Sequence, residues 1–390
     1  MALVLFLYER DMPTVSITRE CFNYLTSIGK VNSKFCQIQG VKACDIDLAD
    51  VLIFIRPNDI TSLSIAEQAK KSGRIVAILQ DDDILILPKE NPFAPWRKKY
   101  LTQMLKGTDI LISSSQCLID RYKERFQVKR TWRIDTIVRT EEFSTVRKRE
   151  HNQIKLVYAA SPKHIGLFNQ FILPIVPKLA EKYGKGITLT FVGMYPDIEN
   201  IKSVIDIDVI SSMPLLEYRK FMQEQQFDIG LAPLVTNDFT ACKYFNKYLE
   251  YTTANIVGVY SKTEPYISVI SDEKNGFLAN NDIDSWYQTL CRAIDNRELR
   301  NTCLENAVVH IKNNHTADAI AERLIENIPE IITGCPNKKL ITSIHKKTFL
   351  YTLNRIRDWA YLSSFYLKNQ GIKGFYSKLK IHIKERNRIR

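Results

Sequence analysis

Lysine and glutamate side chains recur at helical spacing in the segment Phe227–Ser261, FDIGLAPLVTNDFTACKYFNKYLEYTTANIVGVYS. The pattern predicts a strand that ends at Ala232, a polar loop, and a helix that starts near Lys243. Lys243, Lys247 and Glu250 are spaced i, i+4, i+7 and therefore share one helix face. Lys243 would strengthen a diphosphate site at the helix N-terminus, where unpaired N–H groups and partial positive charge already favour anions. Glu250, two turns later, could accept hydrogen bonds from ribose hydroxyls.

The rest of this helix is predicted to pack into a core. Phe245, Tyr248, Leu249 and Thr252 follow the spacing i, i+3, i+4, i+7 of a buried stripe. Asn255 comes where a left-handed cap residue is expected, and asparagine tolerates that conformation. The alternative interpretation of the charged face is a solvated helix surface, because such charge pairs are common on helices.

Two further groups of polar residues follow apolar strands. Ser161 and Lys163 lie in the loop after the predicted strand Lys155–Ala160, where Ser161 could donate a hydrogen bond and Lys163 could supply a positive charge. The alternative is an ordinary strand-to-helix turn. Asp81, Asp82 and Asp83 follow the predicted strand Arg74–Leu79 directly. Carboxylates in that position can act as a general base or bind sugar hydroxyls, and the alternative is a solvated acidic turn.

The elements that carry these residues alternate between short apolar strands and amphipathic helices. In the first half we predict strands at Leu3–Tyr8, Val51–Ile55, Arg74–Leu79 and Asp109–Ser113, with helices at Thr14–Ile28, Ile60–Lys71 and Ser115–Phe126. The polar stretch Arg139–Glu150 suits a linker. In the second half we predict strands at Lys155–Ala160, Ile187–Val192, Asp228–Ala232 and Ile256–Tyr260, with helices at Phe168–Tyr183, Met213–Gln225, Lys243–Ala254, Asp284–Asp295 and Glu298–Asn313. Two successive βαβ units imply two parallel sheets covered by helices, with ligands at the carboxyl ends of the strands.

The segment around Lys243 resembles the donor-binding region of GT-B glycosyltransferases of the retaining group 1 type, glycosyltransferase family 4. The matching residues are Asp228-Ile229-Gly230-Leu231-Ala232-Pro233-Leu234, then Cys242-Lys243, Lys247, Leu249-Glu250-Tyr251 and Ala254-Asn255-Ile256-Val257-Gly258-Val259. The resemblance extends over Lys155 to about Ile331 and is weak in the N-terminal half. This chain departs from the family pattern at two positions. Many relatives have an E-x7-E motif, and its first glutamate is Cys242 here. The glycine that usually follows the helix is Asn255 here.

The resemblance implies roles for the candidate residues. It places Glu250 on the donor ribose, Lys243 near the phosphates, the loop with Ser161 and Lys163 beside the phosphates, and Asp82 and Asp83 toward the acceptor. The family's usual histidine is absent at the acidic turn, so the proton-accepting role is unassigned, and an aspartate there could take the acceptor proton if its environment suits. An acidic run also resembles the metal-binding DxD of the GT-A fold, but a second Rossmann-like unit with a Lys/Glu helix argues against that fold.

Charge is concentrated in the C-terminal tail. The net charge is +12, and residues 335–390 hold 14 Lys and Arg against Asp358 and Glu385, so that the first 334 residues are neutral. This argues against a nucleic-acid-binding body and for a tail that touches an anionic partner, such as membrane lipid. In the resembling fold a C-terminal helix crosses back onto the first domain, and we expect Phe349–Leu362 to pack there through its apolar stripe. Lys378–Arg390 is predicted to contact a membrane or a polymer.

Composition and motifs argue against a disulfide-rich, zinc-binding, secreted or membrane-spanning protein. The eight cysteines form no CxxC motif and are expected to be reduced, and the six histidines form no HExxH motif. The apolar start, Met1–Tyr8, lacks the features of a signal peptide, and no apolar run is long enough for a transmembrane helix.

Together these features predict an α/β chain of the GT-B type, with two Rossmann-like doubly wound domains facing across a cleft. We expect an acceptor-side domain at 1–145, a nucleotide-sugar-binding domain at 146–334 and a basic amphipathic helical tail at 335–390. The predicted site has Asp82, Asp83, Lys243 and Glu250 as catalytic residues, and Ser161, Lys163, Lys243, Lys247 and Glu250 as donor-binding residues.

The expected activity is a retaining, metal-independent, hexosyltransferase-like transfer from a nucleotide-sugar to a glycan or lipid-linked acceptor, as in bacterial surface polysaccharide synthesis. No cofactor, metal or nucleic acid is expected, and the expected location is the cytoplasm, peripheral on the inner face of the membrane. Three alternatives remain: an inverting GT-B enzyme, a catalytically silent GT-B-like glycan- or nucleotide-binding protein, and a nucleic-acid binder that acts through its tail.

Overall fold

The computed structural model describes residues 1–87, 92–144, 153–199, 201–202 and 204–387. The chain divides into two compact units, which we call unit 1 (Met1–Ile134 and Ala321–Arg390) and unit 2 (Asp135–Ile320). The sequence-based boundaries differ from this division, since residues 321–334 were predicted to belong to the second domain and group with unit 1. The change of unit falls inside helix α13 (Ala317–Asn327).

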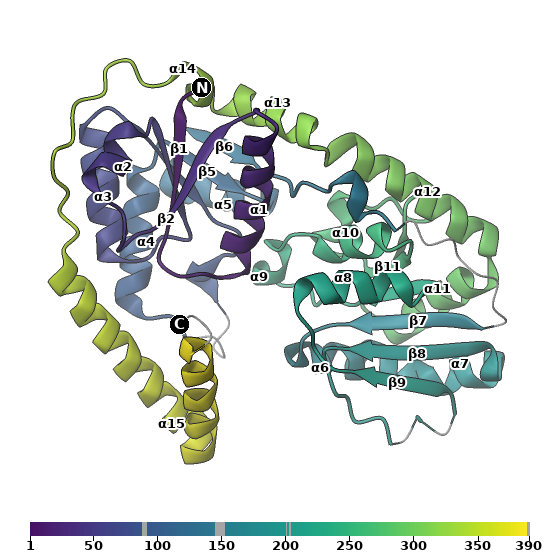
Figure 1. The fold of residues 1–390 in the computed structure, drawn as a ribbon. Helices are drawn as coiled ribbons and strands as arrows, with labels where there is room; N and C mark the ends of the chain where they lie inside the picture. The colour runs from purple at the N-terminus through teal and green to yellow at the C-terminus, as the bar shows by residue number, and fades with distance from the viewer. Residues whose placement is uncertain (88–91, 145–152, 200, 203, 388–390) are drawn as a thin grey trace. The chain divides into compact units, whose positions relative to one another are not determined.

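Unit 1 is built on a parallel six-stranded sheet with helices on both of its faces (Figure 1). The strand order is β2-β1-β3-β4-β5-β6, so the direction of winding changes between β1 and β3. Its strands are β1 (Leu3–Tyr8), β2 (Asn32–Gln37), β3 (Val51–Ile55), β4 (Ile75–Leu79), β5 (Ile110–Ser113) and β6 (Arg130–Arg133). Its helices are α1 (Pro13–Ser27), α2 (Ala43–Leu48), α3 (Ile60–Lys71), η1 (Ile84–Ile86), α4 (Pro95–Gly107), α5 (Gln116–Phe126), α14 (Glu330–Thr333) and α15 (Thr348–Asn387).

Unit 2 repeats this plan with a second parallel sheet in the order β12-β11-β10-β7-β8-β9. Its strands are β7 (Ile154–Ala159), β8 (Ile187–Val192), β9 (Asp206–Ile210), β10 (Ile229–Ala232), β11 (Val257–Ser261) and β12 (Phe277–Ala279). Its longer helices are α7 (Val176–Tyr183), α8 (Leu215–Glu224), α10 (Asn246–Thr253), α11 (Ile283–Asp295) and α12 (Arg297–Asn314). Its short turns are η2 (Thr140–Glu142), η3 (Pro162–His164), α6 (Ile165–Leu167), η4 (Phe168–Ile172), η5 (Leu173–Ile175), η6 (Gly184–Gly186), α9 (Asp238–Ala241) and η7 (Tyr266–Ser268).

The two doubly wound units confirm the predicted fold class. Central strands such as β3 are buried along their whole length, as parallel strands covered on both faces must be. Two predicted helices are irregular. Phe168–Tyr183 is split into a π-turn, a 3-10 turn and α7, because Pro174 and Pro177 lack the N–H group that a continuous helix requires.

The predicted helix Lys243–Ala254 is also wrong at its start. Asn237 accepts hydrogen bonds from the backbone N–H groups of Phe239 and Thr240 and starts the separate helix α9, and α10 then begins only at Asn246. Lys243 therefore lies in the turn between the two helices. The predicted cap holds, since Asn255 has a left-handed φ of 58°.

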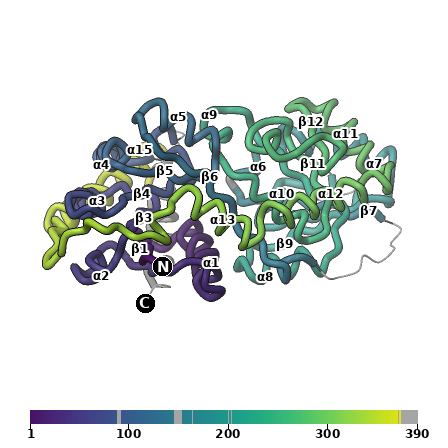
Figure 2. The backbone as a smooth tube through the Cα atoms, turned by 90° about the horizontal axis from the view of Figure 1, so that it is seen from above, coloured from purple at the N-terminus to yellow at the C-terminus, as the bar shows by residue number. Residues whose placement is uncertain are grey.

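The C-terminal segment packs on unit 1, as predicted, but not through its apolar stripe. The backbone N–H of Lys339 donates to the carbonyl of Ser72 (2.8 Å), and Arg74 Nη1 donates to the carbonyl of Lys339 (2.8 Å). α15 then contacts the unit through polar side chains, while the apolar stripe is exposed. Figure 2 shows the path of this segment from α13 along the helices of unit 1.

Candidate functional site

A pocket of about 580 Å³ lies within unit 2 at the carboxyl ends of β7, β8 and β10. We call it the donor pocket, after the predicted donor-binding residues that line it. The loop after β7 contributes Ser161, the loop after β8 contributes Gly193, and the first turn of α10 contributes Asn246 and Lys247. The full lining is Tyr158, Ala159, Ala160, Ser161, Pro162, His164, Val192, Gly193, Tyr195, Ser212, Met213, Tyr218, Pro233, Leu234, Lys243, Tyr244, Asn246, Lys247, Glu250 and Tyr266. This is where ligands bind in open α/β sheets.

Four predicted donor-binding residues, Ser161, Lys243, Lys247 and Glu250, line this one pocket although they span 90 residues of sequence. The side chain of the fifth, Lys163, lies outside the part of the chain that is described. Because α10 begins at Asn246, its N-terminal end and partial positive charge lie at the pocket wall. The pocket thus combines lysine ammonium groups with a helix N-terminus, which suits a diphosphate.

Lys247 and Glu250 form the centre of a hydrogen-bonded group. Lys247 Nζ lies 2.5 Å from Glu250 Oε2, and the Tyr218 hydroxyl donates to the same carboxylate oxygen over 3.0 Å. Lys247 Nζ also lies 3.2 Å from the Tyr218 hydroxyl. Burial alone would lower the pKa of Lys247, but the charge and hydrogen bond of Glu250, together with the nearby tyrosines, raise it overall, so Lys247 is charged at neutral pH. This group fixes the direction in which Glu250 presents its carboxylate.

Aromatic side chains form much of the pocket wall, and the sequence reasoning did not single them out. Tyr158, Tyr218, Tyr244 and Tyr266 line the pocket. Burial raises the pKa of each phenol, so all four are neutral hydrogen-bonding groups. No periodic signal could have found them, because they come from four different elements or loops that meet only in the folded unit.

Gly193 leaves room for the loop after β7. Its φ is +82°, and a Cβ atom there would lie 3.0 Å from the carbonyl oxygen of Ala160. A larger residue would be strained in this conformation and would push against the loop that carries Ser161. The backbone at this position therefore needs glycine to keep the pocket open.

The acidic turn of unit 1 differs from its predicted role. Asp83 is completely buried and does not face outward toward an acceptor. Its carboxylate accepts hydrogen bonds from Tyr122 (2.8 Å), Arg121 (2.8 Å) and the backbone N–H of Leu85 (3.2 Å), so it starts the turn η1 and holds α5. A buried carboxylate needs such partners, and these partners hold Asp83 away from any acceptor. The prediction that Asp83 contacts the acceptor is therefore wrong.

Asp82 keeps an accessible carboxylate at the same turn. Its side chain is about one-third exposed and lies 3.5 Å from Arg56 Nη1, while Asp81 lies 3.3 Å from Arg56 Nε. Arg56 directly follows β3 and has a left-handed φ of 49°, a conformation uncommon for a residue with a side chain. An arginine and two carboxylates therefore meet at the carboxyl ends of β3 and β4.

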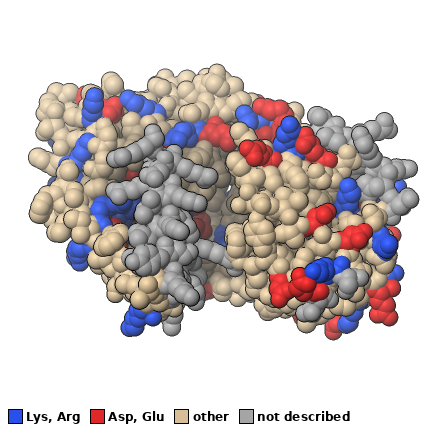
Figure 3. Space-filling view, turned by 60° about the horizontal axis from the view of Figure 1, so that its bottom comes forward, with Lys and Arg blue, Asp and Glu red and all other residues tan. Residues whose placement is uncertain are grey.

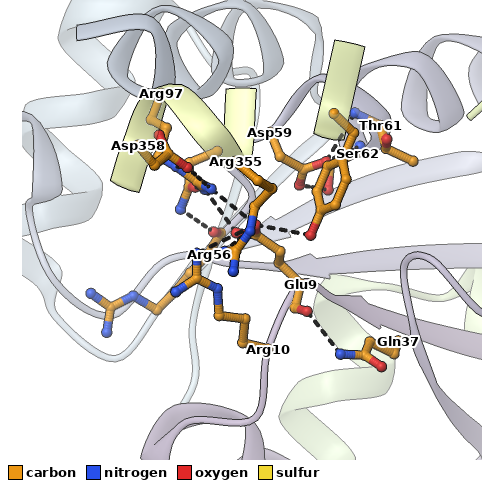
Figure 4. A network of polar contacts seen from close by, with 12 residues as sticks. Glu9, Arg10, Gln37, Arg56, Asp59, Thr61, Ser62, Arg97, Arg355 and Asp358 are labelled. Carbon is orange, nitrogen blue, oxygen red and sulfur yellow. Dashed lines mark hydrogen bonds and ion pairs between the residues drawn. The ribbon is translucent and has the colours of Figure 1, made fainter. Parts of the chain in front are cut away.

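A larger polar network lies beside this turn, at the carboxyl ends of β1 and β3 (Figure 4). Arg97 donates two hydrogen bonds to Glu9 (2.8 and 3.0 Å) and others to Asp358 (2.5 and 2.8 Å). Tyr351 donates to Glu9 (3.1 Å), which joins α15 to the end of β1. Burial alone would raise the pKa of Glu9, but the hydrogen bonds and charge of Arg97 lower it overall. Burial raises the pKa of Asp59 to about 6, and the negative charge of Glu9 adds to that rise.

The sequence reasoning missed this network. Its acidic members, Glu9 and Asp358, are 349 residues apart, and each has an ordinary sequence context taken alone. Two signals were available in the sequence. Glu9 is a charged residue directly after the apolar strand Leu3–Tyr8, and Asp358 is one of only two acids in the basic tail. Within the described ranges of the chain, no group of three or more His, Cys, Asp or Glu side chains is arranged to hold a metal ion.

Comparison with known proteins relates the fold to solved structures. No family model matches the chain, and no curated protein matches it either. Sucrose-phosphate synthase from Thermosynechococcus elongatus aligns with a TM-score of 0.63 at 10% identity, over 85% of this chain and 100% of that one. A glycosyltransferase from Rickettsia africae ESF-5 aligns with a TM-score of 0.60 at 13% identity, over 85% and 98%. Anabaena Alr3699/HepE in complex with UDP-glucose aligns with a TM-score of 0.58 at 12% identity, over 85% and 100%.

The shared feature of these alignments is a pair of Rossmann-like units that together span nearly the whole of each related chain. The parallel sheets of units 1 and 2 account for that similarity. At 10–13% identity the similarity establishes architecture. The chain has the GT-B fold of these glycosyltransferase structures.

Proposed function

We propose that this protein is a glycosyltransferase that binds a nucleotide-sugar in the donor pocket and transfers the sugar to a glycan or lipid-linked acceptor. The observation that carries the proposal is the meeting of Lys243, Lys247, Glu250 and the Ser161 loop around one pocket at the carboxyl ends of the strands. Its volume of about 580 Å³ is ordinary for a small-molecule site. The Anabaena protein of the same fold in complex with UDP-glucose supports a uridine donor as the first to test.

Each predicted donor-binding residue has a role in this proposal. Lys243 and the N-terminus of α10 compensate the charge that develops on the diphosphate as it leaves the sugar. Glu250 accepts hydrogen bonds from the ribose hydroxyls, and its bond to Lys247 orients it for that purpose. Ser161 and Lys163 bind the phosphates from the opposite loop. Because cationic side chains supply the compensation, the proposed transfer is metal-independent and needs no cofactor beyond the substrate.

The acceptor side is proposed with one change from the sequence prediction. Asp82 remains the candidate for the carboxylate that takes the acceptor proton, since Asp83 is used to hold α5. We propose a retaining reaction in bacterial surface polysaccharide synthesis, carried out in the cytoplasm at the inner face of the membrane. Product anomeric configuration, measured by NMR, separates retention from inversion.

Transfer by site variants tests this function. Release of nucleoside diphosphate from UDP-, GDP-, ADP- and dTDP-sugars would be measured with extracted membrane lipids as acceptors. Lys243→Ala and Glu250→Ala are expected to lower kcat/KM by about 100-fold while the chain stays folded, because each removes charge or hydrogen bonds at the donor. Lys220→Ala and Glu224→Ala are matched controls, since that Lys/Glu pair is exposed on α8 and does not line the pocket. Full activity of both pocket variants would refute the assignment.

A second candidate function is a catalytically silent nucleotide-sugar-binding protein. The burial of Asp83 favours it, because that carboxylate is unavailable as a base. Such a protein would bind a nucleotide-sugar, and Glu250→Ala would weaken that binding. It would release no nucleoside diphosphate with any acceptor. Turnover that is lost in Asp82→Asn would exclude it.

A further inference from the structure

Helix α15 lies on unit 1 with its polar side inward. Tyr351, Arg355 and Asp358 recur at i, i+4, i+7, and all three bond within the network around Glu9 and Arg97. Arg355 Nη1 lies 3.4 Å from Glu9 Oε1, and Asp358 is buried. Charged and hydroxyl groups therefore fix the helix to the protein, where an ordinary surface helix would present its apolar side.

The outward side of the same helix is apolar. Phe349, Leu353, Ile356 and Leu367 are spaced i, i+4, i+7, i+18, which places them on one face, and we call them the outer stripe. Phe349 is 80% exposed and Ile356 is 60% exposed, and Trp359 at the edge of the stripe is 56% exposed. A row of large apolar side chains on an exposed helix marks a surface that meets a partner.

Positive charge accompanies this stripe. Residues 335–390 hold 14 Lys and Arg against two acids, a net charge of +12. Side chains of both signs are scattered over the face that Figure 3 shows, in keeping with the neutral composition of the first 334 residues. Among the residues that the structure describes, no helix combines the length and apolar character of a membrane span. An apolar face with an aromatic edge, in a segment of basic sequence, fits a helix that lies in the plane of a membrane interface.

We propose that the outer stripe of α15 inserts into the surface of a lipid bilayer that carries anionic headgroups. The bilayer is favoured over a second copy of the chain, because two tails of charge +12 repel each other whereas anionic lipids attract them. The polar network holds the helix on unit 1 so that its apolar side stays available to lipid. This inference deepens the membrane location in the proposed function, but its test is separate from transfer, since binding to vesicles requires no catalysis.

Vesicle sedimentation of the full chain tests the proposal. The vesicles are phosphatidylcholine alone, or phosphatidylcholine with phosphatidylglycerol at a ratio of three to one. Binding is expected only with phosphatidylglycerol and is expected to weaken as salt is raised. The variant Phe349→Ser/Leu353→Ser/Ile356→Ser should lower the partition coefficient by at least about tenfold, because it removes the apolar insertion. The control Leu48→Ser/Leu216→Ser/Val309→Ser removes three exposed apolar side chains from other helices and should bind as the unaltered chain does.

Tryptophan quenching distinguishes insertion from charge attraction alone. Lipids brominated on their acyl chains should quench part of the fluorescence, and Trp359→Phe should remove that part. Vesicle binding that is unchanged in the triple variant and lacks this quenching would overturn the proposal. A dimer in solution that the same triple variant converts to a monomer would overturn it too, because a second copy would then cover the stripe. A loss of transfer activity with intact vesicle binding would affect only the proposed function.

Discussion

Adjacent aspartates in the acidic turn after β4 have different roles. Asp82 and Asp83 are adjacent in the chain, yet Asp83 is completely buried whereas the Asp82 carboxylate is partly exposed. The difference arises because Tyr122 and Arg121 of α5 reach Asp83 and hold it under the turn. A run of three aspartates in a sequence carries no sign of which carboxylate the next helix will bind.

This separation predicts opposite effects for two conservative variants. Asp83→Asn should lower the free energy of unfolding by about 2 kcal/mol, because its charge-assisted hydrogen bonds are replaced by weaker ones in a buried site. Asp82→Asn should leave the unfolding free energy within about 0.5 kcal/mol but lower transfer, since its carboxylate is accessible. Urea denaturation and transfer assays of both variants check this. A stable, inactive Asp83→Asn would contradict the roles assigned here.

Asp59 should make stability depend on pH. Its carboxyl has a pKa of about 6 in the folded unit, raised by burial from an ordinary value near 3.8. Between these two values the folded chain binds more protons than the unfolded chain, so the contribution of Asp59 to stability falls as pH rises from about 4 to about 6. Asp59→Asn keeps an oxygen that can cap α3 and should remove this decline, which is about 3 kcal/mol at most.

Denaturation at several pH values, compared between Asp59→Asn and the unaltered chain, isolates this residue from Glu9 and other carboxylates that titrate nearby. The stability difference between the two proteins is expected to grow in favour of the variant up to about pH 6 and then to stay level. A constant difference over this range would show that Asp59 does not titrate there.

The candidate site could be predicted in part from residue spacing. Lys243, Lys247 and Glu250 do meet at one pocket, because most of the segment that carries them is helical and follows a strand of the sheet. Tyr218 could not be predicted, since it reaches Glu250 from a different helix, 32 residues away in sequence. Local spacing reports only contacts within an element, and contacts between elements depend on packing.

At the scale of elements, the strands that were missed have a common position. β2 and β6 are the edges of the first sheet, and β9 and β12 are the edges of the second. An edge strand has one neighbour, and β2, β6 and β9 are partly exposed, as in the polar sequence NSKFCQ of β2. β12 is buried and apolar, but it has only three residues. The predicted strands are those with longer continuous apolar runs, which parallel sheets require only in their interior. Burial and strand length thus determine which strands a sequence pattern can reveal.

The docking of α15 provides a test at the same scale. Asp358→Ala removes a buried carboxylate that accepts hydrogen bonds from Trp96 and Arg97. The change should weaken the attachment of the helix by about 2 kcal/mol, although Arg97 keeps its ion pair with Glu9. Hydrogen exchange of residues 348–366 should then become faster, while exchange in unit 2 stays unchanged. Thr352→Ala is the control, since Thr352 is exposed on the same helix. Equal exchange in both variants would show that the network does not hold α15.

For the whole molecule, the fold class followed from the alternation of strands and helices, but the division into units did not. Residues 321–334 follow directly on the helices of unit 2 in sequence, yet they group with unit 1. Arg130 explains part of this, because it donates to Glu330 (2.7 and 3.0 Å) and ties α14 to the end of the first sheet. Such a return of the chain depends on long-range contacts like this ion pair and the bond from the Ala2 N–H to the Ile331 carbonyl, and no composition shift marks them.

The central claim is that the donor pocket of unit 2 binds a nucleoside diphosphate sugar, and thermal denaturation with UDP-, GDP-, ADP- and dTDP-sugars tests it most directly. A ligand at about 100 times its Kd should stabilise the folded chain by roughly 2.7 kcal/mol. We expect one nucleotide class to raise the melting temperature clearly, and Glu250→Ala to abolish that rise while Glu224→Ala preserves it. If no nucleotide-sugar raises the melting temperature, or if the rise is the same in Glu250→Ala, the pocket is not the donor site.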